Sequence, residues 1–289
     1  MLAAKDSIIN ISDSNNVQND LAGGNFELSN ITEIRHSANA VSPSVKLVLS
    51  GIEAYRINGR HHSIGLDRFL IVNRNSRVDL NINDKKGVKG ICIFPAQALV
   101  NDVFRSTKTL CENLLDNPFK EESVDLLEKT FSFNENRTGI FLNHTVKPII
   151  GKYERNEFID FDDFYIGLVE TLIQDQLEIE GKLKNLSSTR KATKEELYRR
   201  VSTAKDYIDS NYIEKINIQD LAQNAYLSKY HFIRTFKALY QLSPYQYLLR
   251  MRLEKAQELL KKEYSISEIN NIIGFSDERN LRKALIKYA

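Results

Sequence analysis

The sequence contains few of the residues on which several protein classes depend. Its 289 residues include two cysteines, Cys92 and Cys111, five prolines and no tryptophan. Two thiols 19 residues apart match neither a zinc motif nor a disulfide framework, so we expect both to be reduced. No segment approaches the ~18 apolar residues of a membrane span. The N-terminus does not have the basic start and following apolar run of a secretory signal. We therefore expect a cytoplasmic protein without a membrane partner.

Sequence signatures of enzymes are missing as well. The chain has no Gly-x-Ser-x-Gly motif, no phosphate-binding glycine loop and no dinucleotide fingerprint. His61 and His62 are adjacent, so on a strand they would point to opposite faces and could not easily share a metal. His36 and His144 are far away in the sequence. We expect no catalytic residues, no metal and no cofactor.

Acidic residues are scarce in the last third of the chain. Residues 190–289 contain 19 Lys and Arg against 12 Asp and Glu, whereas residues 1–189 contain 21 against 26. A basic segment attached to an acidic body indicates a polyanionic partner, because neutralising phosphates releases counterions and raises affinity.

The N-terminal half has the pattern of an antiparallel sheet. After a polar, asparagine-rich segment that we expect to be a loosely packed arm (residues 1–25), five short β-type runs follow between residues 45 and 94. Turn signals at Asn58-Gly59, Asn83-Asp84 and Lys86-Gly87 separate them. This pattern predicts a β-sandwich or a small barrel. Its interior, lined by Tyr55, Ile57, Phe69 and Ile71 or their alternates, would form either a plain core or a site for a small ligand.

A helical pattern begins near residue 160 and continues to 187. Apolar residues recur at three- and four-residue steps from Phe161 to Leu186. This stripe either packs on the β-domain of the same chain or forms the seam of a homodimer. The small polar and basic residues that follow predict a linker over 188–194, with a capping signal at Thr193.

The C-terminal region contains one structural unit twice. In each copy a short helix, a tight turn and a capping residue precede a basic helix, over residues 218–239 and 267–288. The two caps are Ser228 and Asp277, and a long helix that begins at Ser243-Pro244 separates the copies. Short helix, turn and second helix is the helix-turn-helix pattern, whose second helix enters the major groove of DNA.

The stretch SKYHFIRTFK, residues 228–237, shows the chemistry of such a helix. Phe232 and Phe236 lie four residues apart, and the stretch contains no acidic residue. A carboxylate there would face phosphates, whereas Arg is suited to guanine, and His, Lys and Tyr can donate to base edges or phosphates.

This region resembles the AraC/XylS-type transcriptional regulators over about residues 197–288. The spacing of many positions carries the resemblance. They are Leu221, Ala222, Leu227, Ser228, Arg234, Phe236, Lys237, Ser243, Pro244, Tyr247, Arg252, Leu253, Ala256, Leu259, Leu260, Ile269, Gly274 and Phe275.

The resemblance implies an α+β protein with two domains. Residues 1–187 would be an effector-sensing or dimerising domain with a small, cupin-like antiparallel β-barrel and helices, and residues 195–289 an all-α domain of two helix-turn-helix units joined by a linker helix. The implied partners are promoter or operator DNA, a small-molecule effector, a second copy of the chain and RNA polymerase. The implied DNA-binding residues are Ser228, Lys229, Tyr230, His231, Arg234 and Lys237 in the first unit, and Glu278, Arg279, Asn280 and Lys283 in the second.

Several positions depart from the family pattern, most of them in the second unit. Gln241 occupies the usual place of a glycine before Ser-Pro, and Asn270 that of a small residue. Glu278 suits the start of a helix but not phosphate, Leu281 replaces a usual phenylalanine, and the sequence ends before the family's trailing Gly-x-Ser-Pro segment. We expect the first unit to be the main reader of sequence.

Two other functions compete with DNA-dependent regulation. One is a metal-dependent cupin-type enzyme with a DNA-binding tail. The other is a protein-binding regulator whose helix-turn-helix units no longer bind DNA.

Overall fold

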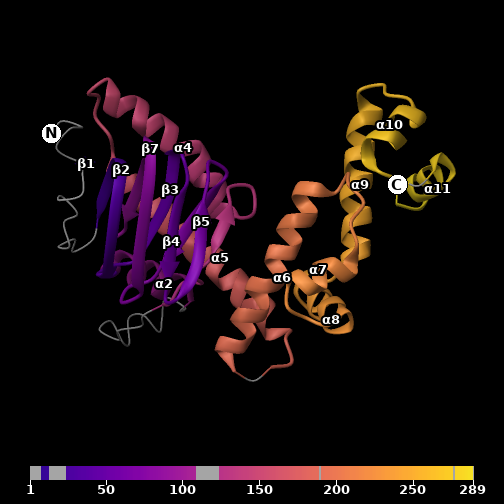
Figure 1. The fold of residues 1–289 in the computed structure, drawn as a ribbon, viewed down its shortest axis with the longest axis horizontal. Coiled ribbons are helices and arrows are strands. Elements are labelled where there is room, and N and C mark those ends of the chain that lie inside the picture. The colour runs from indigo at the N-terminus through magenta and orange to yellow at the C-terminus, as the bar shows by residue number, and fades with distance from the viewer. Residues whose placement is uncertain (1–7, 13–23, 109–123, 189, 276, 289) are drawn as a thin grey trace. The chain divides into compact units, whose positions relative to one another are not determined.

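A computed structural model of the chain describes residues 8–12, 24–108, 124–188, 190–275 and 277–288. The fold is a mixed α+β architecture with an N-terminal sheet and a helical C-terminal part (Figure 1). The chain divides into two compact units, Met1–Glu178 and Ile179–Ala289. Within the described residues, no helix combines the length and the apolar character needed to cross a bilayer.

The sheet of the first unit contains eight strands. Its main path runs β1-β2-β7-β3-β6-β8, and β4 pairs with both β5 and β7. Pairing between β1 and β8 is not seen among the described residues, so the path is open at both ends. The bounds are β1 Ile8–Ser12, β2 Asn25–Asn39, β3 Ser44–Ser50, β4 Glu53–Ile57, β5 Arg60–Ile64, β6 Arg68–Val72, β7 Arg77–Phe94 and β8 Thr130–Ser132.

Two predictions for this sheet are wrong. Part of the expected N-terminal arm is strand β1, which pairs in parallel with β2 and buries Ile8 and Ile11. The turns expected at Asn83-Asp84 and Lys86-Gly87 lie inside the long strand β7. There, residues 84–87 stand opposite Thr32 alone, and Gly87 has a φ of +77°. Residues before this irregularity pair with β4 and residues after it pair with β3, so the glycine signal marks a change of partner and not a hairpin.

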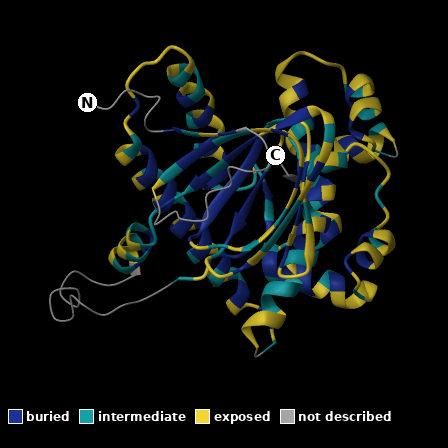
Figure 2. Cartoon of the chain, turned by 60° about the vertical axis from the view of Figure 1, so that its left-hand side comes forward, coloured by how far each residue is buried: buried dark blue, intermediate teal, exposed yellow. Residues whose placement is uncertain are grey.

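Helices of the same unit pack on one face of the sheet. On β2, Phe26 is fully buried against Phe161 and Phe164 of helix α5 (Phe161–Lys184), with ring centroids 5.7 and 5.9 Å away. Phe141 of α4 (Arg137–Glu154) stacks on Phe164. This packing uses the apolar stripe of α5 within its own unit, as the first of the two interpretations predicts. The strands are buried over much of their length (Figure 2), and helix α2 (Gln97–Lys108) follows β7.

The second unit contains the predicted pairs of helices and the helix between them. The bounds are α6 Lys191–Asn211, α7 Ile218–Asn224, α8 Lys229–Tyr240, α9 Pro244–Lys261, α10 Ile266–Ile273 and α11 Glu278–Tyr288. Helix α6 begins at Lys191, so Thr193 lies inside the helix and the predicted cap there is wrong. The Ser243 hydroxyl accepts from the Gln246 amide in a capping box, which explains the start of α9 at Pro244.

Each helix pair has its own core. Phe232 and Phe236 of α8 are fully buried, and the Phe236 ring lies 5.7 Å from that of Tyr247 on α9. The other core consists of aliphatic side chains from α9, α10 and α11, including the fully buried Leu281, and Ala284 packs at its edge. The Asn270 side-chain oxygen is buried there without a hydrogen-bond partner in the described chain. The expected weakness of the second unit therefore has a physical basis, since an unsatisfied buried acceptor costs about 1–3 kcal/mol.

Gln241 ends α8 in a strained backbone conformation. Its φ is +62°, in the left-handed region that favours glycine, and its side-chain amide donates to the Ala238 carbonyl oxygen at 3.2 Å.

Replacing Gln241 with glycine should stabilise this turn. We expect Gln241→Gly to raise the free energy of unfolding by about 1 kcal/mol, because glycine has no Cβ to clash in this region. Urea denaturation of the full chain, followed by circular dichroism at the helix band, measures this. The control Gln246→Gly should lower stability, because it breaks the capping box inside the first turn of α9. A loss of stability in Gln241→Gly would contradict the assignment of strain.

Candidate nucleic-acid interface and ligand cavity

The first candidate site is the exposed face of α8. Ser228 caps the helix and accepts from the His231 amide at 3.3 Å. Phe232, Thr235, Phe236 and Leu239 face the core, which leaves the predicted contact residues on the outside. Lys229, Tyr230, His231, Arg234 and Lys237 are all exposed, and Tyr230 is 77% exposed.

These outward side chains have no partners of their own. Among the described residues, none of the five makes a side-chain hydrogen bond or an ion pair. Elsewhere in the same unit, exposed cations are commonly paired, as Arg250 is with Glu254 at 2.7 Å. An acid-free helix face with unpaired donors can therefore contact phosphates and base edges without first breaking intramolecular bonds.

Two of the four corresponding residues of α11, Asn280 and Glu278, are engaged within the chain. The Asn280 side-chain amide donates to the Asp277 carboxylate at 2.8 Å, and Asp277 also caps the helix by accepting from the Asn280 backbone amide. Glu278 lies 4.0 Å from Arg282. Arg279 and Lys283 are exposed. Among the predicted contact residues, the second helix therefore presents two cations, whereas the first presents three cations together with His231 and Tyr230.

One arginine between the helix pairs connects them. Arg252 of α9 donates to three carbonyl oxygens: Tyr212 at 2.6 Å, Glu214 at 2.7 Å and Gly274 at 2.8 Å. Gly274 has a φ of +70°, and a Cβ there would lie 2.2 Å from the Ile213 carbonyl oxygen. The end of α6 and the end of α10 therefore meet at Arg252, at a point where only glycine fits.

Arg252→Lys should disrupt this connection. A lysine is a point charge and cannot reproduce the planar fork of donors, so at least one carbonyl oxygen loses its charged partner. We expect the free energy of unfolding to fall by about 2–3 kcal/mol, because hydrogen bonds to charged groups are worth roughly 1.5–3 kcal/mol each. Urea denaturation measures the change. The control Arg250→Lys alters an exposed, singly paired arginine on the same helix and should stay within about 0.5 kcal/mol of the parent. Equal stability of the two variants would contradict the proposed connection.

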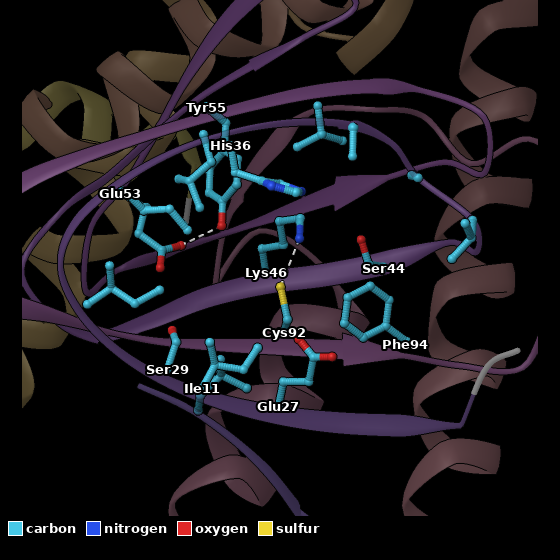
Figure 3. A pocket seen from close by; sticks show the side chains of 18 of the residues that line it. Ile11, Glu27, Ser29, His36, Ser44, Lys46, Glu53, Tyr55, Cys92 and Phe94 are labelled. Atoms are coloured by element: carbon cyan, nitrogen blue, oxygen red, sulfur yellow. Dashed lines mark hydrogen bonds between the residues drawn. The ribbon is translucent and has the colours of Figure 1, made fainter. Parts of the chain in front are cut away.

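The second candidate site is a cavity in the first unit. Its volume is about 130 Å³, and Glu27, Lys46 and Cys92 are among the residues that line it (Figure 3). Successive residues of a strand point to opposite faces of the sheet, so Glu27 and its neighbour Phe26 lie on opposite faces. Glu27 of β2, Cys92 of β7 and Lys46 of β3 lie side by side, because Cys92 pairs in register with both of the others. We call these three residues the Glu27–Cys92–Lys46 row.

Lys46 is a buried cation that has several partners. Its ammonium donates to the Cys92 sulfur at 2.8 Å and lies 5.4 Å from the ring centroids of both Tyr55 and Phe94. Burial alone would lower the pKa of Lys46, but the neighbouring Cys92, Glu53 and Glu27 outweigh burial and raise it. Burial raises the pKa of the Cys92 thiol to about 11. The raised pKa of Lys46 favours its ammonium form, and the raised pKa of Cys92 favours its neutral thiol.

Two buried acids share the cavity with this cation. Glu53 accepts from the Tyr55 hydroxyl at 2.8 Å, and burial raises the pKa of Glu53. Gly90 makes room for Glu53, because a Cβ at Gly90 would lie 2.2 Å from the Glu53 carboxylate. Glu27 is 6% exposed, and burial, opposed by the charge of Lys46, raises its pKa to about 7.

Sequence reasoning did not find this row. Tyr55 does line the cavity, but Ile57 packs in a core cluster, and Phe69 stacks on Phe131. The available signal was Lys46 in the apolar run VKLVLS, since a lysine flanked by buried valine and leucine needs a partner.

The pH dependence of stability should report on Glu27. In the folded protein the Glu27 carboxyl keeps its proton up to about pH 7, whereas in the unfolded chain it loses this proton near pH 4.5. The folded state therefore binds more protons between these values, and stability falls as pH rises through this window. In the parent protein, Glu27 should lower the free energy of unfolding by about 1.4 kcal/mol per pH unit within this window. We expect the Glu27→Gln variant to lack this contribution, which amounts to up to ~3 kcal/mol between pH 5 and 8.

Urea denaturation at several pH values measures this difference. Glu33→Gln, at an exposed position on the same strand, is the matched control and should retain the slope of the parent. Parallel stability curves for the parent and Glu27→Gln would show that Glu27 does not titrate in this window.

The histidines do not gather around a metal. His61 lies 3.0 Å from the Arg56 guanidinium, and His62 lies 3.3 Å from the Thr130 hydroxyl. Within the described residues, no three His, Cys, Asp or Glu side chains are grouped so that they could hold a metal ion.

Comparison with known proteins defines the class of the second unit. A family model described as a helix-turn-helix domain matches residues 221–289. The Msm operon regulatory protein of Streptococcus mutans is 31% identical over 134 residues, which cover 46% of this chain and 45% of that protein. The transcriptional regulatory protein HptR of Staphylococcus aureus is 23% identical over 214 residues, which cover 71% of this chain and 81% of that protein.

A solved structure shows the same likeness. The DNA-binding domain of AdpA, in complex with a target DNA, is 28% identical over 30% of this chain and 80% of that chain, with a TM-score of 0.29. The family model shows that residues 221–289 form a helix-turn-helix domain. It is of the AraC type. The match to the Msm operon regulatory protein spans less than half of that protein's length. These relatives are regulators and lend no support to the cupin-type enzyme.

Proposed function

We propose that this protein is a sequence-specific DNA-binding transcription regulator that is controlled through its N-terminal domain. The exposed face of α8 is the observation that carries the proposal, because its donors are unpaired and no acid lies among them. Such a face suits a major groove, where Arg recognises guanine and Lys neutralises phosphate. The protein would act in the cytoplasm.

The first helix-turn-helix unit is the main reader in this proposal. Arg234 is the best candidate for contact with a base, and Lys229, Tyr230, His231 and Lys237 surround it. Ser228 positions the start of the helix. In the second unit, Arg279 and Lys283 would contact phosphates, while Glu278 and Asn280 are engaged with their own helix. The third function considered, a regulator that no longer binds DNA, does not account for the free cations of α8.

The N-terminal domain, residues 1–187, would bind a small-molecule effector in the cavity beside the Glu27–Cys92–Lys46 row. The cavity on one face of the sheet supports a ligand-binding role for this domain. Residues 188–194 would connect this domain to the DNA-binding domain at 195–289. Dimerisation and contact with RNA polymerase remain predictions of the family resemblance.

Selection of binding sites from random duplex DNA tests the proposed function. We expect the full-length protein to enrich one block of sequence, or two blocks about one helical turn apart if α11 also reads bases. Salt-dependent titration of the enriched site then measures phosphate contacts. Failure of the full-length protein to enrich any sequence would overturn the proposal.

Arg234→Ala separates base reading from phosphate contact. If Arg234 reads a base, its removal should weaken binding to the selected site by about 1–3 kcal/mol and relax specificity at one position. Fluorescence anisotropy on the selected site and on random DNA measures both effects. Arg250→Ala removes the same charge from α9 and is the matched control. An equal loss on both DNAs would show that Arg234 contacts phosphate.

A further inference from the structure

The cavity of the first unit contains a buried acid that has no hydrogen-bond partner among the described residues. Glu27 lines the cavity and is 6% exposed, yet in the described part of the chain its carboxylate forms neither a hydrogen bond nor an ion pair. A buried carboxylate ordinarily accepts several hydrogen bonds or pairs with a cation. The side chain therefore has free acceptor capacity directed at the cavity (Figure 3).

The neighbouring Lys46 and Tyr55, unlike Glu27, each have a hydrogen-bond partner within the described chain. The Lys46 ammonium donates to Cys92, and the Tyr55 hydroxyl donates to Glu53. Two carboxylates, Glu27 and Glu53, stand against the single buried ammonium of Lys46. His36 lines the cavity near Tyr55 and is half-buried (Figure 3). When both acids are ionised, a ligand with one positive charge would balance the excess negative charge, whereas an anion would face both carboxylates.

The remaining walls suit a small apolar body. They come mainly from Ile11, Ile31, Ile34, Leu80, Ile91 and Phe94. The volume of about 130 Å³ is close to that of cavities of roughly 150 Å³ that accept benzene. The Phe94 and Tyr55 rings already lie near one cation, Lys46, and their faces can attract a second.

We propose that the cavity binds a small organic ammonium ion, with its charged nitrogen on Glu27 and its apolar body against the aliphatic wall. This assignment rests on the proposal that the cavity is the effector site, and it gives the chemical class of the effector. The ammonium supplies the hydrogen bonds that Glu27 lacks, and the apolar body fills the space beside Phe94.

Isothermal titration calorimetry on the full-length protein without DNA tests the assignment. The probes are benzylammonium, benzyl alcohol and benzoate, which share one ring and differ in charge. At pH 8 Glu27 is ionised in the folded protein and a primary ammonium is still protonated. We expect saturable binding of benzylammonium, at least tenfold tighter than that of benzyl alcohol, and no saturable binding of benzoate.

The Glu27→Gln variant then tests whether the ammonium group of the ligand binds to the Glu27 carboxylate. It should lower the affinity for benzylammonium at least tenfold and leave that for benzyl alcohol unchanged, and Glu33→Gln should change neither. If Glu27→Gln fails to fold, the comparison of the three probes on the parent protein decides alone. Benzoate binding as tightly as benzylammonium, equal benzylammonium affinity in a folded Glu27→Gln variant, or no saturation with any probe would overturn the assignment. DNA selection is a separate measurement, so failure here leaves the proposed DNA-binding function standing.

Discussion

The DNA-binding unit depends on the three hydrogen bonds that Arg252 donates. Carbonyl groups at a helix C-terminus carry partial negative charge and have no partner within the helix. Arg252 brings one cation to such groups at the ends of α6 and α10. Burial lowers the pKa of the guanidinium, but an arginine remains charged under all ordinary conditions. Because Gly274 lacks a Cβ, the Ile213 carbonyl can approach it closely. Arg252 and the missing side chain of Gly274 therefore hold the end of α6 close to the end of α10.

The two helix pairs are built alike but are not equivalent. The first has a core of packed aromatic rings and an outer face of unpaired donors. The second has an aliphatic core with an unsatisfied amide oxygen at Asn270, and its helix α11 uses Asn280 for its own cap. A side chain that is already hydrogen-bonded must give up that bond before it contacts a base, which reduces the net gain. In the proposed function, the first unit would therefore be the stronger reader and the second the weaker one.

The sequence predicts the helical unit better than the sheet, for physical reasons. Caps such as Ser228 and Ser243 and the recurrence of Phe232 and Phe236 are local signals, and the helices lie where these signals place them. Strand partners depend on contacts far apart in sequence. The local turn signals within β7 therefore predict two turns, whereas they mark the place where β7 changes its partner from β4 to β3. The Glu27–Cys92–Lys46 row joins residues from three separated strands, and only the register of the sheet brings them together. Sequence alone showed an unusual lysine and not its partners.

Glu27 is adjacent in sequence to Phe26, which packs on helix α5. Successive residues of a strand point to opposite faces, so Glu27 faces the cavity while its neighbour Phe26 packs on Phe161 and Phe164 of α5. Helix α5 is also the element in which the chain passes from the first compact unit into the second. A ligand shifts a conformational equilibrium only by its difference in affinity for the two states. If β2 has two positions relative to α5, a group that binds Glu27 in one of them biases α5 by the same free energy.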